Sequence, residues 1–246
     1  IEGLTFIMAR TTHGEIGFSL PGVVEHPPKE DLDILVRFAG AFDIAHRRFL
    51  DLKKSEAQSR EVEIELALEK VRSRSMGMQK SEELKEVIQV VYQQFVHLNI
   101  NTEHTGFVMD YKERDDRLIW VASKHGIPSQ LVIPNFDSEY YNSFNEAKAK
   151  GLDFFATNLS FEEKNAFYRE LFTHIPELPE EDKKFYFSCP GLAISTVLLD
   201  NIGLYIENFE GIPYSDEDNT VLMRFGKVFQ QTYTRFLDLQ NAEAQA

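Results

Sequence analysis

The longest regular pattern of apolar and polar positions runs from about Asp31 to about Ser75. This stretch contains no proline and a single glycine, Gly40. Its apolar residues recur at alternating steps of three and four, which places them on one face of a helix. The spacing therefore predicts one amphipathic helix of about 45 residues. The first half of its apolar stripe consists of Leu35, Phe38, Phe42, Ala45, Phe49 and Leu52.

The second half of this helix carries a weaker pattern with a period of seven. Leu50, Ala57, Ile64, Val71 and Met78 follow one another at that interval, and Leu68 adds a second seam. One interpretation is a long surface helix that packs on its own domain. The other is a parallel two-helix connector, which we favour because so long a helix needs a partner for its stripe. On that interpretation the chain is a homodimer whose linker contacts involve Ala57, Ile64, Leu68 and Val71.

Alternating and helical patterns in the rest of the chain predict an α+β fold with an antiparallel sheet. Residues 4–10 and 15–20 form one expected hairpin, and Asp200-Asn201 marks a tight turn between strands 192–199 and 203–207. Ser81 and Ser215 are expected to cap the helices that follow them. The other expected strands are 104–111, 117–124 and 153–157, and the other expected helices are 84–95, 137–150, 161–174 and 179–187.

Part of the sequence occurs twice. Residues 35–59 align without a gap to residues 222–246, with 12 identities in 25 positions. The match extends upstream, where Gly3-Leu4 corresponds to Gly191-Leu192. Phe38 and Phe225 are 187 residues apart, which fits one domain plus one linker. The repeat indicates that the chain begins inside one copy of a domain, crosses a linker and contains one complete copy.

The repeat sets the expected domain boundaries. Residues 1–42 are the C-terminal part of a preceding copy, and residues 43–79 are a helical linker with possible coiled-coil character. Residues 80–235 are the complete domain, and residues 236–246 start the next linker helix. The first hairpin lacks the rest of its copy, so we expect it to pack on another chain or on the helices of the complete domain.

Charge and composition narrow the partners. The 40 acidic residues outnumber the 26 basic ones, for a formal net charge of −14, which disfavours nucleic acid as a direct partner. No run of 18 apolar residues occurs, so we expect no membrane contact by this chain. The single cysteine, Cys189, allows no intrachain disulfide, and we expect a cytoplasmic protein.

The order of elements between residues 80 and 235 resembles that of a GAF domain. The residues that carry the resemblance are Pro213-Tyr214-Ser215-Asp216-Glu217-Asp218, whose entry into the last helix is similar to the characteristic GAF ending. Residues 57–84 resemble the linkers of bacterial sensor proteins with repeated GAF-like domains, often histidine kinases or cyclase-like regulators. The resemblance implies a central antiparallel sheet with helices on its faces, and a tandem-repeat signal-transduction protein.

Aromatic residues concentrate between Phe136 and Phe187, in the segments that would cover the GAF-like sheet. One interpretation is a bulky aromatic core that seals the sheet face. The other is an aromatic-lined pocket for a small, flat or apolar ligand, oriented by tyrosine hydroxyls. The strand residues expected to form the floor of such a pocket are Phe107, Met109, Trp120, Ile194 and Thr196. The expected cover residues are Tyr140, Phe144, Phe155, Phe185 and Phe187.

Catalytic motifs do not stand out in the sequence. There is no Gly-x-Ser-x-Gly elbow, P-loop or dinucleotide fingerprint, and the seven histidines show no paired metal spacing. We therefore expect a non-catalytic sensory or regulatory module without a metal site, which binds a small ligand and relays the change through dimeric linker helices. The alternative is a structural dimerisation or spacer domain with a filled core. A catalytic GAF relative ranks last, and the sequence identifies no cofactor.

Overall fold

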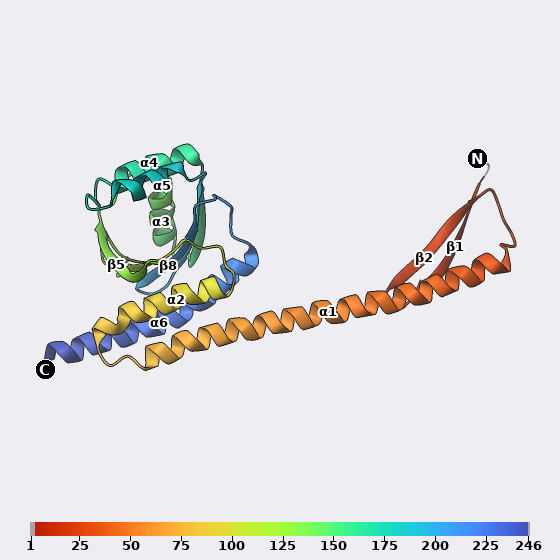
Figure 1. The fold of residues 1–246 in the computed structure, drawn as a ribbon, viewed down its shortest axis with the longest axis horizontal. Coiled ribbons are helices and arrows are strands. Elements are labelled where there is room, and N and C mark those ends of the chain that lie inside the picture. The colour runs from red at the N-terminus through yellow and green to blue at the C-terminus, as the bar shows by residue number, and fades with distance from the viewer. Residues whose placement is uncertain (1–2, 246) are drawn as a thin grey trace. The chain divides into compact units, whose positions relative to one another are not determined.

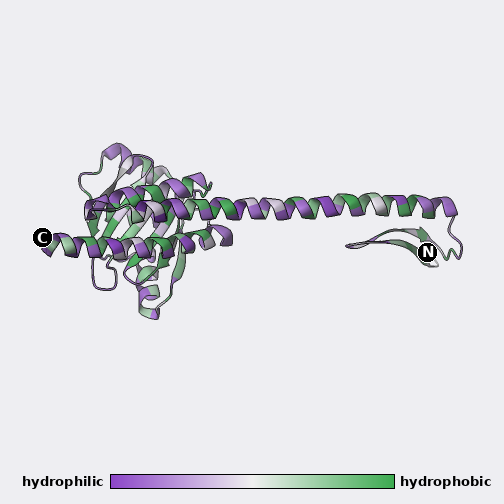
Figure 2. Ribbon diagram, turned by 90° about the horizontal axis from the view of Figure 1, so that it is seen from below, coloured by the Kyte–Doolittle hydropathy of each residue, from purple (hydrophilic) through white to green (hydrophobic). Residues whose placement is uncertain are grey.

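The computed structural model describes residues 3–245, with the backbone alone at residues 127–129. The chain divides into two compact units between Val62 and Glu63. Helix α1 (Lys29–Met76) contributes residues to both units, and it is continuous, as the sequence pattern predicts. Figure 2 shows apolar positions recurring among polar ones along this helix.

The first unit is a β-hairpin followed by the N-terminal part of α1. Strands β1 (Leu4–Thr11) and β2 (Gly14–Pro21) pair antiparallel, as expected. The backbone N–H and the hydroxyl of Thr12 both donate to the carboxylate of Asp43, at 2.8 and 2.7 Å. The rings of His13 and His46 lie 5.4 Å apart. The hairpin therefore packs on the helix that follows it, whereas we expected another chain or the helices of the complete domain.

The second unit is built on one six-stranded antiparallel sheet, in the order β5-β4-β3-β8-β7-β6. This confirms the α+β class and the antiparallel sheet. Its strands are β3 (His104–Met109), β4 (Arg117–Ser123), β5 (Gly126–Ile133), β6 (Phe154–Leu159), β7 (Leu192–Leu198) and β8 (Ile202–Asn208). Its helices after α1 are the 3-10 turn η1 (Ser81–Glu83), α2 (Leu84–His97), α3 (Glu139–Lys150), α4 (Phe161–Leu171), α5 (Glu180–Ser188) and α6 (Asp216–Gln245).

Helices cover both faces of this sheet (Figure 1). The α2 and α6 helices lie on one face together with the end of α1, and their side chains form one apolar core. Helices α3, α4 and α5 lie on the other face and form a second, aromatic-rich core. Alternate residues of β3, β4, β7 and β8 therefore belong to different cores.

The capping predictions have opposite outcomes. Ser215 caps α6 as expected, since its hydroxyl accepts the Asp218 N–H at 3.1 Å while the Asp218 carboxylate accepts the Ser215 N–H. Ser81 does not cap α2, because the 3-10 turn that it begins separates it from that helix. Its hydroxyl instead donates to Glu243 of α6 at 2.6 Å.

The expected partner-facing seam of α1 needs correction. Ile64, Leu68 and Val71 are buried in the core of the second unit, with α2 and α6, while Ala57 stays exposed. These three side chains are not available to a second α1 helix. For the C-terminal part of α1, the structure therefore supports the interpretation of a helix that packs on its own domain.

The sequence repeat has a structural counterpart. In the first unit a hairpin, β1–β2, leads into α1, and in the second unit β7–β8 leads into α6. The aligned phenylalanines differ in environment, because Phe38 is 64% exposed whereas Phe225 is fully buried. Phe42 and Phe229 show the same contrast, at 51% and 0%. The apolar stripe at the start of α1 thus has the composition of a domain interior.

Candidate functional site

A cavity of about 540 Å³ lies between the sheet and helices α3–α5. Its floor comes from alternate residues of β3, β4, β5, β7 and β8, and its walls come from aromatic side chains of the covering helices and loops. The floor includes Val108, Ile119, Val121, Leu131, Ile133, Ile194 and Tyr205. The walls include Tyr140, Tyr141, Phe167, Tyr168, Phe172, Phe185, Tyr186 and Phe209.

Gly106 of β3 makes room for one of these floor side chains. A Cβ atom at this position would lie 1.9 Å from the ring of Tyr205 on the neighbouring strand β8. The tyrosine ring therefore crosses the sheet directly over the glycine. This close approach sets the depth of the floor at the centre of the sheet.

The strand register places three of the expected floor residues on the other face. Phe107, Met109 and Trp120 belong to the core formed with α2 and α6, where the Phe107 ring contacts Phe229 at 4.3 Å between centroids. Their strand neighbours Val108, Ile119 and Val121 face the cavity instead. Of the ten expected ligand contacts, Tyr140, Phe185 and Ile194 line the cavity.

The other four expected residues share the cavity face of the sheet without lining the cavity. Phe144 is fully buried against the ring of Tyr111, at 5.6 Å between centroids. Phe155 lies 5.8 Å from Phe144, and Phe187 lies 5.6 Å from Phe172. The Thr196 hydroxyl is 3.4 Å from that of Tyr140. These residues form the packed part of the aromatic layer, so the layer is a core in one region and a cavity wall in another.

One end of the cavity is acidic. His104 Nδ1 lies 2.7 Å from Glu207 Oε1, a pair formed across the central strands β3 and β8. Glu207 is a buried residue, and 11% of its side chain is exposed. Glu103, Glu177 and Asp182 add further carboxylates to the lining. Burial first, and the Glu207 carboxylate second, raise the pKa of Tyr168, Tyr186 and Tyr205.

The sequence pattern did not single out this pair. A signal was present, because Glu207 is the only charged residue in the strand Ile202–Asn208. A carboxylate in a strand that is buried on both faces needs a partner or a function. The partner, His104, is 103 residues away in the chain, so only the sheet register reveals it.

Arg117 is buried at the opposite end of the cavity. Its Nη2 donates to Asn145 Oδ1 at 2.8 Å, and its guanidinium lies over the rings of Tyr141 and Phe144, at 4.6 and 4.3 Å. Burial lowers the pKa of this side chain. Amides and ring faces therefore hold the cation where a carboxylate would be usual.

Lys164 and Cys189 fix helix α5 over the cavity. The buried ammonium of Lys164 donates to the Tyr186 carbonyl oxygen and to Asn165 Oδ1. The Cys189 thiol donates to the Phe185 carbonyl oxygen at 3.2 Å, and burial raises the pKa of the thiol. A protonated, hydrogen-bonded thiol is a poor nucleophile, so its role here is structural.

Within residues 3–245, no three His, Cys, Asp or Glu side chains gather in a way that could hold a metal ion. No helix in the same range is both long and apolar enough to cross a bilayer. Comparison with protein-family models gives no match, and comparison with curated proteins gives none either. The proposals below therefore rest on the geometry of the site and on the internal repeat.

Proposed function

We propose that residues 63–245 form a GAF-like sensory or regulatory module that binds a small ligand in the cavity over its sheet. The observation that carries this proposal is the cavity itself. Its volume, about 540 Å³, lies in the range of small-molecule sites, and its aromatic walls with a few polar groups are typical of them. A spacer domain with a filled core would not contain a cavity of this size.

The proposed relay runs from the cover of the cavity to α6. Lys148 of α3 donates to the Tyr111 carbonyl oxygen at 2.6 Å. The adjacent residue, Asp110, accepts the hydroxyl of Tyr233 of α6 at 2.8 Å. A ligand that moves α3 would thus shift the turn after β3 and, through it, α6. These contacts give the relay a physical route, and a coupling measurement must test it.

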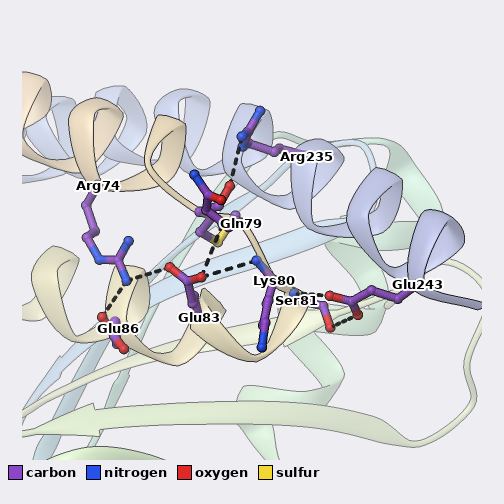
Figure 3. A network of polar contacts seen from close by, with 9 residues as sticks. Arg74, Gln79, Lys80, Ser81, Glu83, Glu86, Arg235 and Glu243 are labelled. Carbon is purple, nitrogen blue, oxygen red and sulfur yellow. Dashed lines mark hydrogen bonds and ion pairs between the residues drawn. The ribbon is translucent and has the colours of Figure 1, made fainter. Parts of the chain in front are cut away.

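A second group of contacts joins α6 to the segment between α1 and α2 (Figure 3). Glu243 accepts both the N–H and the hydroxyl of Ser81, at 2.9 and 2.6 Å. Arg235 donates to the Met78 carbonyl oxygen at 2.8 Å. Arg74 of α1 bridges Glu83 and Glu86 on the far side of the turn. The incoming and outgoing helices of the module are therefore linked at one junction, which is where the relay would deliver a change.

The alternative is a structural spacer that binds nothing, and a cavity-filling variant separates the two functions. Val121→Phe adds a ring on the cavity floor, whereas Val132→Phe makes the same change on the exposed opposite face of the neighbouring strand. Native mass spectrometry of each purified protein reports a retained ligand and the number of subunits. We expect a discrete added mass on the unmodified chain and on Val132→Phe, and its loss from Val121→Phe.

The same spectra test pairing of two chains, which we propose as part of the relay through the exposed half of α1. A retained mass that both variants keep would argue against the cavity as the site. If the unmodified protein is fully folded and carries no added mass, the structural spacer is favoured. A monomer would contradict the pairing of two chains and would confine the proposed relay to a single chain.

The relay itself is tested with Tyr233→Phe, which removes only the hydroxyl that meets Asp110. Ligand binding should persist, while ligand-dependent protection of α6 in hydrogen–deuterium exchange should disappear. Tyr214→Phe is the matched control, because it removes a hydroxyl that donates to the Asn101 carbonyl oxygen, away from this route. If α6 responds to ligand equally in both variants, the proposed route is wrong.

A further inference from the structure

The acidic end of the cavity combines a buried carboxylate with several ring faces. Tyr168 and Tyr186 lie 4.9 Å apart between centroids, and Tyr186 and Phe209 lie 5.2 Å apart. The His104 ring lies 5.3 Å from Phe209, so the histidine–glutamate pair adjoins this aromatic group. Ring faces attract organic cations, and desolvation strengthens the attraction.

The charged groups at this end favour a positive ligand group. Glu207 uses its Oε1 atom for His104, and the half-buried Glu103, next to His104 in the chain, adds a second carboxylate to this end. Asp182 and Glu177 also line the cavity, and both are exposed. The lining also contains a basic residue, Lys124, which is exposed to solvent. A cation that enters here would be attracted by the carboxylates. The buried Lys164 ammonium, 6.0 Å from the centre of the Tyr168 ring, lies outside the lining and donates to the Tyr186 carbonyl oxygen and to Asn165 Oδ1.

Arg117, the other cation of the lining, lies too far away to repel such a group. It stands six residues along β4 from Ser123, which pairs with His104 in the sheet. Six residues of an extended strand span about 20 Å. The arginine and the His104–Glu207 pair therefore occupy opposite ends of the cavity.

Tyr168 supplies an independent indication of a missing partner. Its side chain is 3% exposed and lines the cavity. Among the side chains of the described region, its hydroxyl is one of the buried polar groups without a hydrogen-bond partner. A buried hydroxyl left unsatisfied costs free energy, and the N–H of a protonated amine at this end would recover it by donating to the hydroxyl oxygen. A quaternary ammonium has no N–H and would bind through its charge and the ring faces alone.

We propose that the ligand of this cavity is an organic cation, an amine or quaternary ammonium on a flat or apolar body. Its positive group binds between the Glu207 carboxylate and the rings of Tyr186 and Phe209, and its body extends along the floor. This inference rests on the proposed ligand-binding function and specifies the chemical class of the ligand.

The experiment compares three probes of similar size and different charge. Benzyltrimethylammonium carries the cation, neopentylbenzene is its neutral counterpart, and phenylacetate is an anion of related shape. Binding of each to the full chain is measured by ligand-observed NMR. We expect the cation to bind at least tenfold more tightly than the neutral probe, and phenylacetate to bind most weakly.

Two matched substitutions locate the positive group. Glu207→Gln keeps the shape of the side chain and removes its charge, and it should weaken binding of the cation tenfold or more. Glu210→Gln removes a charge from an exposed glutamate just beyond the same strand and should leave binding unchanged. Because Glu207→Gln also changes the contact with His104, Tyr186→Leu provides a second test through loss of the ring face. Thermal unfolding shows whether each variant remains folded.

Several results would overturn the cationic class. These are equal affinity for the cationic and neutral probes, tighter binding of phenylacetate, no binding of the cation, or unchanged cation binding in both folded Glu207→Gln and Tyr186→Leu. None of these results would by itself refute ligand binding, because a retained neutral or anionic ligand that Val121→Phe displaces would still support the proposed function. The two proposals can therefore fail separately.

Discussion

Lys164 is a buried lysine that joins two of the helices over the cavity. Its ammonium lies 5.0 Å from the centre of the Phe161 ring and donates to the carbonyl oxygen of Tyr186. Burial lowers the pKa of this lysine. Because its acceptor belongs to α5, the side chain fixes the position of a residue that lines the acidic end of the cavity.

Replacement of this lysine should destabilise the second unit. Lys164→Met keeps an unbranched side chain but leaves the Tyr186 carbonyl without its donor, which should cost about 1–3 kcal/mol in the free energy of unfolding. Urea denaturation followed by Trp120 fluorescence measures the change. Lys184→Met, at an exposed position of α5, should change the same quantity by no more than about 0.5 kcal/mol. Equal effects of the two changes would show that the buried contact is unimportant.

Gly106 makes a second prediction at the residue scale. Gly106→Ala places a methyl group on the Tyr205 ring, which must move, and overpacking of this kind costs about 1–3 kcal/mol. Gly203→Ala, on the adjacent strand, meets its nearest atom at 3.3 Å and should cost less. Urea denaturation compares the two variants. A smaller loss for Gly106→Ala than for Gly203→Ala would contradict the close approach described here.

At the scale of elements, the strands are more predictable than their faces. The pattern locates five strands of the main sheet, but it puts Phe107, Met109 and Trp120 on the cavity face. Strands β3, β7 and β8 are almost entirely buried, so neither face has the polar residues that would reveal the phase of the alternation. Strand β5 is missed because Pro128 and its polar neighbours interrupt the apolar pattern. The His104–Glu207 pair and the Ser81–Glu243 contact depend on tertiary register, which no local pattern contains.

The contact between Ser81 and α6 should depend on pH. Hydrogen bonds from Ser81 lower the pKa of Glu243 below its ordinary value of 4.5. A carboxyl whose pKa is lower in the folded state stabilises the fold above its unfolded pKa and loses that contribution as the pH falls through the folded pKa. The contact should therefore be intact at neutral pH and weaken below about pH 4.5.

NMR spectroscopy can follow this titration at one atom. The amide signal of Ser81 should shift with an apparent pKa below 4.5, and Glu243→Gln should abolish that shift. Asp238→Asn is the matched control, because it removes an exposed carboxylate from the same helix and should leave the shift in place. A Ser81 signal that is insensitive to pH in the unmodified chain would exclude the contact in solution.

At the scale of the whole molecule, the repeated sequence places the same apolar pattern in two environments. It is exposed at the start of α1 and buried in the aligned part of α6. The sequence predicts a long amphipathic helix, and its period-seven pattern predicts a second chain as the partner of part of the stripe. The buried positions of Ile64, Leu68 and Val71 show that period-seven spacing does not distinguish a partner helix from the interior of the same domain. The apolar stripe of α6 is likewise buried in the core of its own unit, where it includes Leu222, Phe225 and Phe229.

Identical substitutions in the two copies should therefore have unequal effects. Phe225→Ala opens a cavity in a closed core and should cost about 3–5 kcal/mol. Phe38→Ala, at the aligned but exposed position, should change stability by no more than about 0.5 kcal/mol. Urea denaturation followed by circular dichroism gives both values. A large loss for Phe38→Ala would mean that its side chain is covered in solution.

The burial of the end of α1 also determines how the second unit can be isolated. A recombinant domain that starts at residue 80, where the sequence places the boundary, would lack the Ile64, Leu68 and Val71 side chains that fill the groove beside α2 and α6. The exposed groove would make such a protein prone to aggregation. A domain that starts before Glu63 retains these turns of α1. The segment that looks like a linker in the sequence is therefore part of the smallest piece of this chain that should be expressed in folded form.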